Sequence, residues 1–255
     1  MRVAALLSAM SVAAVSAVAQ PAFELQAIRW SPNLDGSIRS ITLAQQVDPD
    51  LATIDFKRDL GMSDQDHDEY RLVARTGPRS RLRFGTMTMD YSGDQTVERT
   101  IVFHGETYSV GTRVVSDLSM KYQRLGWIWE PVGTERAALG FIVEAKKIDL
   151  DAALDAPETD PPVRERRSLS ATFPSLGLAL DLRPTRAIAF YAEVTGIAAG
   201  SKGHLFDGEA GVRLQVASFL TILGGWRSFD LKVEDEPDFG KFTNSGGFLG
   251  LAVGL

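Results

Sequence analysis

Histidine is the side chain in this sequence best suited to proton transfer near neutral pH, because its unperturbed pKa lies close to working pH. The 255-residue chain contains three histidines, His67, His104 and His204. His67 lies between Asp66 and Asp68, which makes it a candidate acid-oriented base for a hydrolase. Its candidate nucleophiles are Ser92, Ser201 or a water molecule. Neighbours on a loop need not face each other, however, so we interpret the histidines as solvated loop residues and expect no catalytic activity.

Other kinds of site find little support. The chain has no cysteine, which excludes disulfides, thiolate nucleophiles and cysteine zinc sites. A formal charge of -6 and a pI near 5.2 argue against nucleic acid as a partner. Acidic stretches at 32–68, 149–163 and 234–240 either hold divalent cations or simply keep loops solvated. Neither a specific calcium motif nor a phosphate loop is present, and we expect no cofactor.

The elements that position these residues follow from alternating hydrophobicity. Residues 209–216 place Ala210, Val212, Leu214 and Val216 on one face and charged or small residues on the other. A repeat of two residues is typical of strands with two unlike faces, and no long helical stripe follows residue 20. We therefore predict an all-β fold of about ten strands, with eight or twelve as alternatives because 53–57 and 97–103 could add short strands. The predicted strands are 22–31, 68–76, 80–92, 113–129, 136–153, 167–183, 186–198, 206–217, 220–234 and 241–254.

Connections of two lengths alternate along the chain. Short turns are predicted near residues 76–79, 131–134, 183–186 and 217–219, and long loops at 32–67, 93–112, 154–166, 199–205 and 235–240. In an antiparallel up-and-down barrel this alternation places tight turns at one end and long loops at the other, as in outer-membrane barrels. Within 167–183, Pro174 coincides with a change of apolar face, which we interpret as a bulge.

The first nineteen residues have the features of an export signal. Arg2 precedes an apolar run from Val3 to Val15, and Ala17-Val18-Ala19 has small residues at the expected cleavage position. A transmembrane anchor is the alternative, but the run is shorter than a bilayer core requires. We expect cleavage after Ala19, which leaves 20–255 as a single barrel domain.

Alternation alone does not say which face is inside, so a soluble lipocalin-like barrel is also compatible with it. Aromatics near strand ends, Trp30, Trp127, Trp129 and Trp226, favour a membrane barrel with girdles on its apolar outer face. The enclosed face would then carry a charge network that fills a narrow lumen. The predicted lumen residues are Arg71, Arg75, Lys121, Glu144, Lys146, Glu193, Glu209 and Arg213.

The end of the chain supplies a resemblance. Leu249, Leu251, Val253 and Leu255 share one face of a terminal strand, similar to the C-terminal assembly signal of Gram-negative outer-membrane proteins. With the export signal, the alternation and the loop asymmetry, residues 20–255 resemble small outer-membrane barrels of the OmpA/OmpW kind, although Leu255 stands where that family usually has an aromatic. The resemblance implies insertion from the periplasm by the assembly machinery, and contact with the bilayer and lipopolysaccharide. We expect a structural or surface-interaction role, with a small-solute channel, a surface hydrolase and a periplasmic binder as alternatives.

Overall fold

The protein folds as a ring of antiparallel strands. The computed structural model describes residues 21–39, 52–103, 105–235 and 238–255. The ten long strands are β1 (Phe23–Arg39), β3 (His67–Gly77), β4 (Ser80–Thr96), β7 (Arg113–Gly133), β8 (Ala137–Ala156), β9 (Val163–Leu182), β10 (Ile188–Ala198), β11 (Gly203–Ala217), β12 (Leu220–Asp235) and β13 (Asp238–Gly254). Three short strands, β2 (Thr53–Asp55), β5 (Ile101–Phe103) and β6 (Glu106–Tyr108), and the 3-10 turn η1 (Gly200–Lys202) complete the described elements. No helix among these residues is long and apolar enough to span a bilayer.

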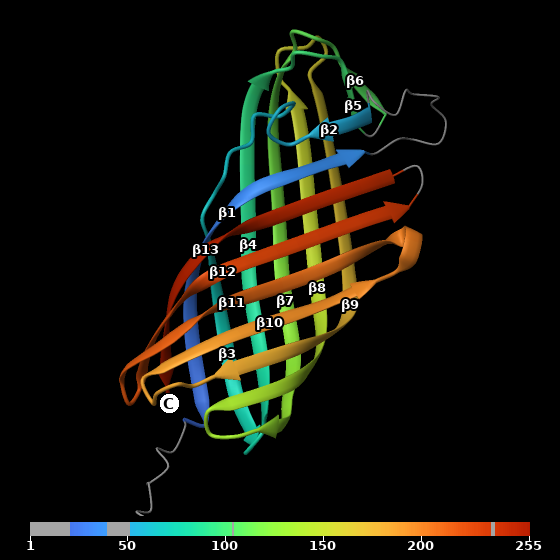
Figure 1. The fold of residues 1–255 in the computed structure, drawn as a ribbon. Coiled ribbons are helices and arrows are strands. Elements are labelled where there is room, and N and C mark those ends of the chain that lie inside the picture. Colours follow the sequence, from blue (N-terminus) through green and yellow to red (C-terminus); the bar gives the residue numbers. More distant parts are fainter. Residues whose placement is uncertain (1–20, 40–51, 104, 236–237) are drawn as a thin grey trace, which may run out of the picture.

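Pairing of the first and last strands closes the ring. Successive long strands are neighbours, and β1 pairs with β13 from Glu24 opposite Gly254 to Arg39 opposite Phe239 (Figure 1). The predicted all-β, antiparallel, ten-stranded barrel is therefore confirmed. The segments 53–57 and 97–103 contain only the short strands β2 and β5, which lie inside connections and add no strand to the ring.

The two ends of the barrel differ, although less regularly than predicted. Tight turns join β3 to β4, β7 to β8 and β11 to β12 at the lower end in Figure 1, where the C-terminus also lies. Long connections follow β1 and β4 at the upper end. The long loops predicted at 199–205 and 235–240 are wrong, because β11 begins at Gly203, directly after η1, and β13 begins at Asp238, close to the end of β12 at Asp235.

Each face of β9 changes polarity halfway along the strand. Leu176, Leu178, Leu180 and Leu182 point outward in the lower half, and Leu178 is 49% exposed. Directly above Pro174 the inner face becomes apolar at Phe173 and Ala171, and Phe173 packs against the buried core. The β8–β9 register runs from Ala137 opposite Leu182 to Ala156 opposite Val163 without a shift, so the predicted bulge at Pro174 is wrong. The apparent change of face is a change of polarity along a regular strand.

Neighbouring strands change polarity at the same level. On β8, Phe141 and Val143 are exposed below Ala145, whereas Ile148 and Leu154 are buried above it. Ala145 lies opposite both Leu125 of β7 and Pro174 of β9, which defines a polarity boundary across the wall. Below this boundary, in the lower half, the outer face is apolar and the inner face polar. Above it, in the upper half, the arrangement is reversed as in a water-soluble barrel.

Aromatic side chains fill the inside of the upper half. Trp30, predicted to lie in an outer girdle, is 0% exposed and lies inside. Trp226 is 55% exposed on the outer face, and Trp127 and Trp129 are also exposed there. Trp30 occupies an inward position of β1, between the buried Ile28 and Leu34. The correction follows from strand parity, because residue type alone does not assign a face.

One connection packs against the edge of β4. Above Met87, β4 has no ladder with β3, and the segment after β2 covers this part of the strand. A Cβ atom at Gly93 would lie 2.0 Å from the Leu60 carbonyl oxygen, so only glycine permits this approach. Ser116 donates a hydrogen bond to the same oxygen (3.5 Å).

Candidate functional site

A network of ion pairs occupies the lumen of the lower half. At its upper edge, Arg227 of β12 donates from Nε to Asp207 Oδ1 (3.0 Å) and from Nη2 to Asp207 Oδ2 (2.9 Å). Its Nη1 reaches Glu69 Oε2 of β3 at 2.6 Å. Arg124 of β7 holds the other Glu69 oxygen at 2.9 Å, and Tyr122 donates to Asp207 Oδ2 at 2.8 Å. Side chains from β3, β7, β11 and β12 thus meet in the middle of the barrel.

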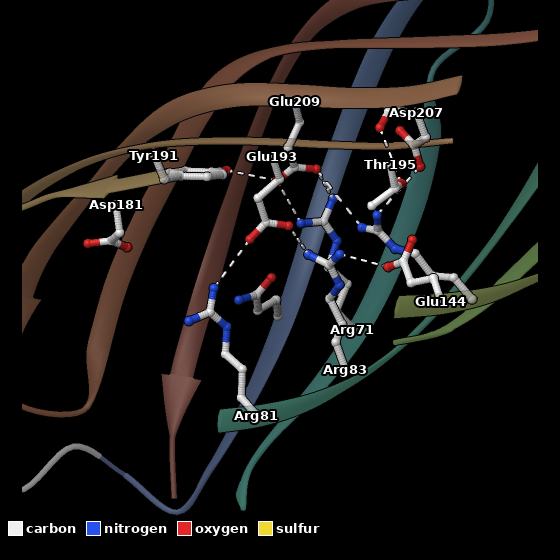
Figure 2. Close-up of polar contacts among 12 residues, drawn as sticks. Arg71, Arg81, Arg83, Glu144, Asp181, Tyr191, Glu193, Thr195, Asp207 and Glu209 are labelled. Carbon is white, nitrogen blue, oxygen red and sulfur yellow. Dashed lines mark hydrogen bonds and ion pairs between the residues drawn. The ribbon is translucent and has the colours of Figure 1, made fainter. Parts of the chain in front are cut away.

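A second cluster lies below the first, and Figure 2 shows its side chains converging from opposite walls. Arg71 donates to Glu69 (2.7 Å) and to Glu209 (2.5 Å between Nη2 and Oε2). Arg83 pairs with Glu144 (2.8 Å) and with Glu193. These residues are at most 8% exposed. Each guanidinium lies between two carboxylates, which offsets part of the cost of removing the charges from water, although Arg71 Nε and Arg83 Nε make no hydrogen bond within the described residues.

The network continues to the lower end of the barrel. Arg213 and Arg183 both donate to Asp181, each at 2.6 Å, and the Arg213 guanidinium carbon lies 3.9 Å from the Tyr191 ring centroid. Lys146, which is fully buried, donates to Thr195 Oγ1 at 2.6 Å. Opposite charges are thus paired across the interior of the lower half.

The structure places most of the predicted lumen residues inside the barrel. Those that are buried or partly buried in the network are Arg71, Glu144, Lys146, Glu193, Glu209 and Arg213. Arg75 is on the inner face but exposed, because it lies next to the lower turn, where the last β3–β4 pair is Gly77 opposite Ser80. Lys121 is wrong as a lumen residue: it is exposed on the outer face, because inward positions of β7 are the even-numbered Tyr122 and Arg124.

Several network residues were absent from the predicted set. They are Glu69, Arg83, Tyr122, Arg124, Asp181, Tyr191, Thr195, Asp207 and Arg227. Arg83 and Arg124 occupy alternate positions next to outward aromatic or aliphatic residues, a signal that strict counting of strand parity would have detected. Their ion-pair partners come from distant strands, which no local pattern indicates.

Above the ion network, aromatic rings close the bore. The Tyr122 and Phe229 ring centroids are 5.4 Å apart, those of Phe229 and Phe242 are 6.2 Å apart, and those of Tyr91 and Phe242 are 5.9 Å apart. All four side chains are buried. Edge-to-face contacts of this kind produce a packed core. Paired charges therefore occupy the interior of the lower half, and packed aromatic rings occupy the interior of the upper half.

The described histidines do not form the predicted hydrolytic arrangement. His67 points inward, and its Nε2 lies 2.8 Å from the Tyr91 hydroxyl, whereas Asp68 points outward and pairs with Arg29 (3.2 Å). Ser92 and Ser201 are exposed elsewhere, and His104 lies outside the described residues. Sequence reasoning missed a partly buried pair on β11 and β12, in which His204 Nε2 is 3.0 Å from Asp230 Oδ2.

The terminal residues Leu249, Leu251, Val253 and Leu255 are all exposed, Leu251 by 52%. Their strand completes the ring through its ladder with β1. The predicted export signal, residues 1–19, lies outside the described residues. Within the described residues, no group of three or more acidic or histidine side chains is placed to hold a metal ion.

Comparison with solved structures supports the architecture. The outer-membrane protease OmpT of Escherichia coli has a TM-score of 0.53 and 8% identity, and the match covers 94% of this chain and all of that one. The fold is that of a bacterial outer-membrane β-barrel. The resemblance to small outer-membrane barrels is thus confirmed at the level of the fold.

Other outer-membrane barrels match less well. The toluene transporter TodX of Pseudomonas putida has a TM-score of 0.40 and 8% identity, covering 93% of each chain. Neisserial surface protein A has a TM-score of 0.38 and 11% identity, covering 92% of this chain and 97% of that one. No protein-family model and no curated protein sequence matches this chain. At these identities, similarity describes the architecture and assigns no activity.

Proposed function

We propose that the protein spans the bacterial outer membrane as a non-conducting barrel and presents its upper half at the cell surface for structural or binding interactions. The apolar outer face of the lower half supports insertion. On β11 the outward positions from Phe206 to Val216 are apolar or glycine. Ten intervals of about 3.3 Å, on a strand tilted by about 40°, span about 25 Å, the usual height of an outer-membrane apolar band.

The packed lumen is the observation that carries the non-conducting role. A solute entering from the upper half would first have to displace the ring cluster around Phe229 and then the paired charges around Arg227. Breaking a buried ion pair leaves an uncompensated charge and is strongly unfavourable. This arrangement favours a closed scaffold over a small-solute channel.

The upper half supports a surface role because it is built as a water-soluble body. Its outer face carries polar pairs such as Ser119 with Asp90 (2.5 Å) and Ser170 with Asp149 (2.5 Å). Its interior holds the buried aromatic core. The outer-leaflet lipids, including lipopolysaccharide, would contact the barrel at the polarity boundary, and the terminal strand β13 would carry the signal for assembly.

A binding role is better supported than surface hydrolysis. His67 contacts a tyrosine rather than an acid, and Asp66 and Asp68 both lie near Arg29. Asp230, the partner of His204, uses its second oxygen to accept a hydrogen bond from Thr243 at 3.0 Å. That hydroxyl therefore points at the acid, whereas a nucleophile activated by His204 would point at the imidazole.

Planar-bilayer recording on refolded protein tests the proposal. Insertion is established first by co-flotation with lipid vesicles and by a change in gel migration upon boiling. Inserted wild-type protein is expected to show no conductance steps over a range of voltages. Stepwise conductance from the same preparation would contradict the closed lumen and favour the channel.

A further inference from the structure

Two hollows adjoin on the outer wall at the polarity boundary. The upper hollow, of about 490 Å³, lies beside the start of β3 and the middle of β4, and Thr86 and Thr88 are among its lining residues. The lower hollow, of about 450 Å³, crosses β1, β12 and β13. Asp68 and Tyr70 line both of them. The two hollows therefore meet at Asp68 and Tyr70, with mainly apolar residues lining the lower one and mainly polar residues lining the upper one.

The lower hollow exists because a small residue lies between large ones. Ala27 of β1 is directly opposite Tyr70 on one side and Leu251 on the other. Ile222 and Leu249 complete its apolar walls. All of these side chains belong to the apolar outer face, so a hydrocarbon chain fits this groove without burying a polar group.

Charged groups follow in a fixed order above the groove. Arg29 lies at its top, with Nε 3.2 Å from Asp68 Oδ1 and 3.9 Å from Asp66 Oδ2. Asp66, Asp68 and Asp90 then line the upper hollow. His67, which is 4% exposed, also lines it, and Nε2 of its ring lies 2.8 Å from the Tyr91 hydroxyl.

The geometry points to a binding site for an outer-leaflet lipid with a phosphoethanolamine-type headgroup. The order of groove, guanidinium and carboxylates matches the order of acyl chain, phosphate and ammonium in such a lipid. Arg29 would bind the phosphate, and Asp66 and Asp90 would bind the ammonium. This inference rests on the proposed function, because it requires the lower half to lie in a bilayer.

Charge favours this lipid over the alternatives. Three carboxylates and one guanidinium repel a headgroup with net negative charge, because like charges in proximity are destabilising. A basic peptide would satisfy the carboxylates but would leave the groove beside Ala27 without a hydrocarbon occupant. The site therefore requires both an ammonium group and an acyl chain.

Competitive lipid retention tests the site. Wild-type protein is reconstituted in an equimolar mixture of phosphatidylethanolamine and phosphatidylglycerol with identical acyl chains, then released into detergent and analysed by native mass spectrometry. We expect phosphatidylethanolamine to be retained about fivefold over phosphatidylglycerol, which corresponds to a weak, partly exposed ion pair. Equal retention of the two lipids by inserted wild-type protein would overturn the inference.

Two variants separate the headgroup from the acyl contacts. The double variant Asp66→Asn/Asp90→Asn keeps the Arg29–Asp68 pair and is expected to lose the preference. Ala27→Leu fills the groove and is expected to retain less of both lipids than Ala145→Leu, a matched change at an exposed outer position of β8. An undiminished preference in the double variant, or equal retention by the two alanine variants, would contradict the site.

The same preparation separates failure of this inference from failure of the proposed function. If the protein does not float with vesicles of either lipid and its gel migration is unchanged by boiling, the membrane role itself is wrong. If it inserts normally and retains both lipids equally, only the lipid site is wrong.

Discussion

The guanidinium carbon of Arg227 lies 5.0 Å from the centroid of the Trp30 ring. This contact joins the ion network to the apolar interior, because Arg227 pairs with Asp207 and Glu69 and Trp30 is part of the buried core. A cation over an indole face is stabilised by the ring quadrupole, particularly away from water. The arginine is 1% exposed and the tryptophan 0%. The polar and apolar interiors therefore meet at this pair of buried side chains.

Removal of this arginine should destabilise the barrel strongly. Arg227→Met leaves Asp207 and Glu69 without one of their cations, and we expect a loss of about 3–5 kcal/mol in the free energy of unfolding. Urea titration of protein in lipid vesicles, followed by tryptophan fluorescence, measures the loss. Arg113→Met serves as the control because the partners of Arg113, Asp94 and Glu158, are exposed, and no measurable change is expected. Equal stability of the two variants would show that the lumen network is not stabilising.

The polarity boundary on β9 predicts that an arginine on the outer face destabilises the protein below the boundary and is tolerated above it. Leu178→Arg places a cation in the apolar band, and we expect a loss of about 2–4 kcal/mol in the free energy of unfolding. Thr172→Arg, which lies above Pro174 on the same outer face, should be tolerated because that position faces water. Unfolding by urea in vesicles compares the two. A similar cost at both positions would place the boundary elsewhere.

The loop between β2 and β3 should loosen in acid. Burial alone would raise the pKa of Asp59, but hydrogen bonds from Arg99 and Arg58 outweigh burial and hold this pKa well below its usual range. A carboxyl with a depressed pKa stabilises the folded state above its unfolded pKa of about 3.9, and this stability is lost as pH falls toward the lower folded value. Protection of the loop from an acid-active protease should therefore decrease below about pH 4.

Asp59→Asn provides the control for this pH dependence. The variant lacks the titrating group, so its loop should be less protected at pH 7 and should change less on acidification. If wild type and variant lose protection in parallel between pH 5 and pH 3, another carboxyl controls the loop.

Local sequence pattern was sufficient for the number of long strands and for the architecture, but not for every strand end, because β1 continues to Arg39 and β11 begins at Gly203. Alternation at 209–216 correctly located β11, and the alternation of short and long connections predicted a barrel with tight turns at one end. The reason is that strand formation and strand ends depend on neighbouring residues, through side-chain period and turn chemistry. The outward direction of Leu251 and Leu178 followed from the same pattern once a membrane was inferred.

The interior could not be derived in this way. Arg71 and Glu209 meet at 2.5 Å although 138 positions separate them, so their pairing depends on the closure and register of the whole ring. The reversal at Pro174 likewise looked like a bulge, because a local pattern does not distinguish a strand that changes face from an environment that changes around a regular strand.

By itself, the sequence determined that the chain alternates along its length and therefore forms paired strands. Only the tertiary structure decided which side of each strand is enclosed at each level, and hence that Trp30 is inside while Trp226 is outside. The physical reason is that alternation records a difference between two faces, whereas the sign of that difference depends on what surrounds the barrel, which under the proposed function is hydrocarbon below the polarity boundary and water above it.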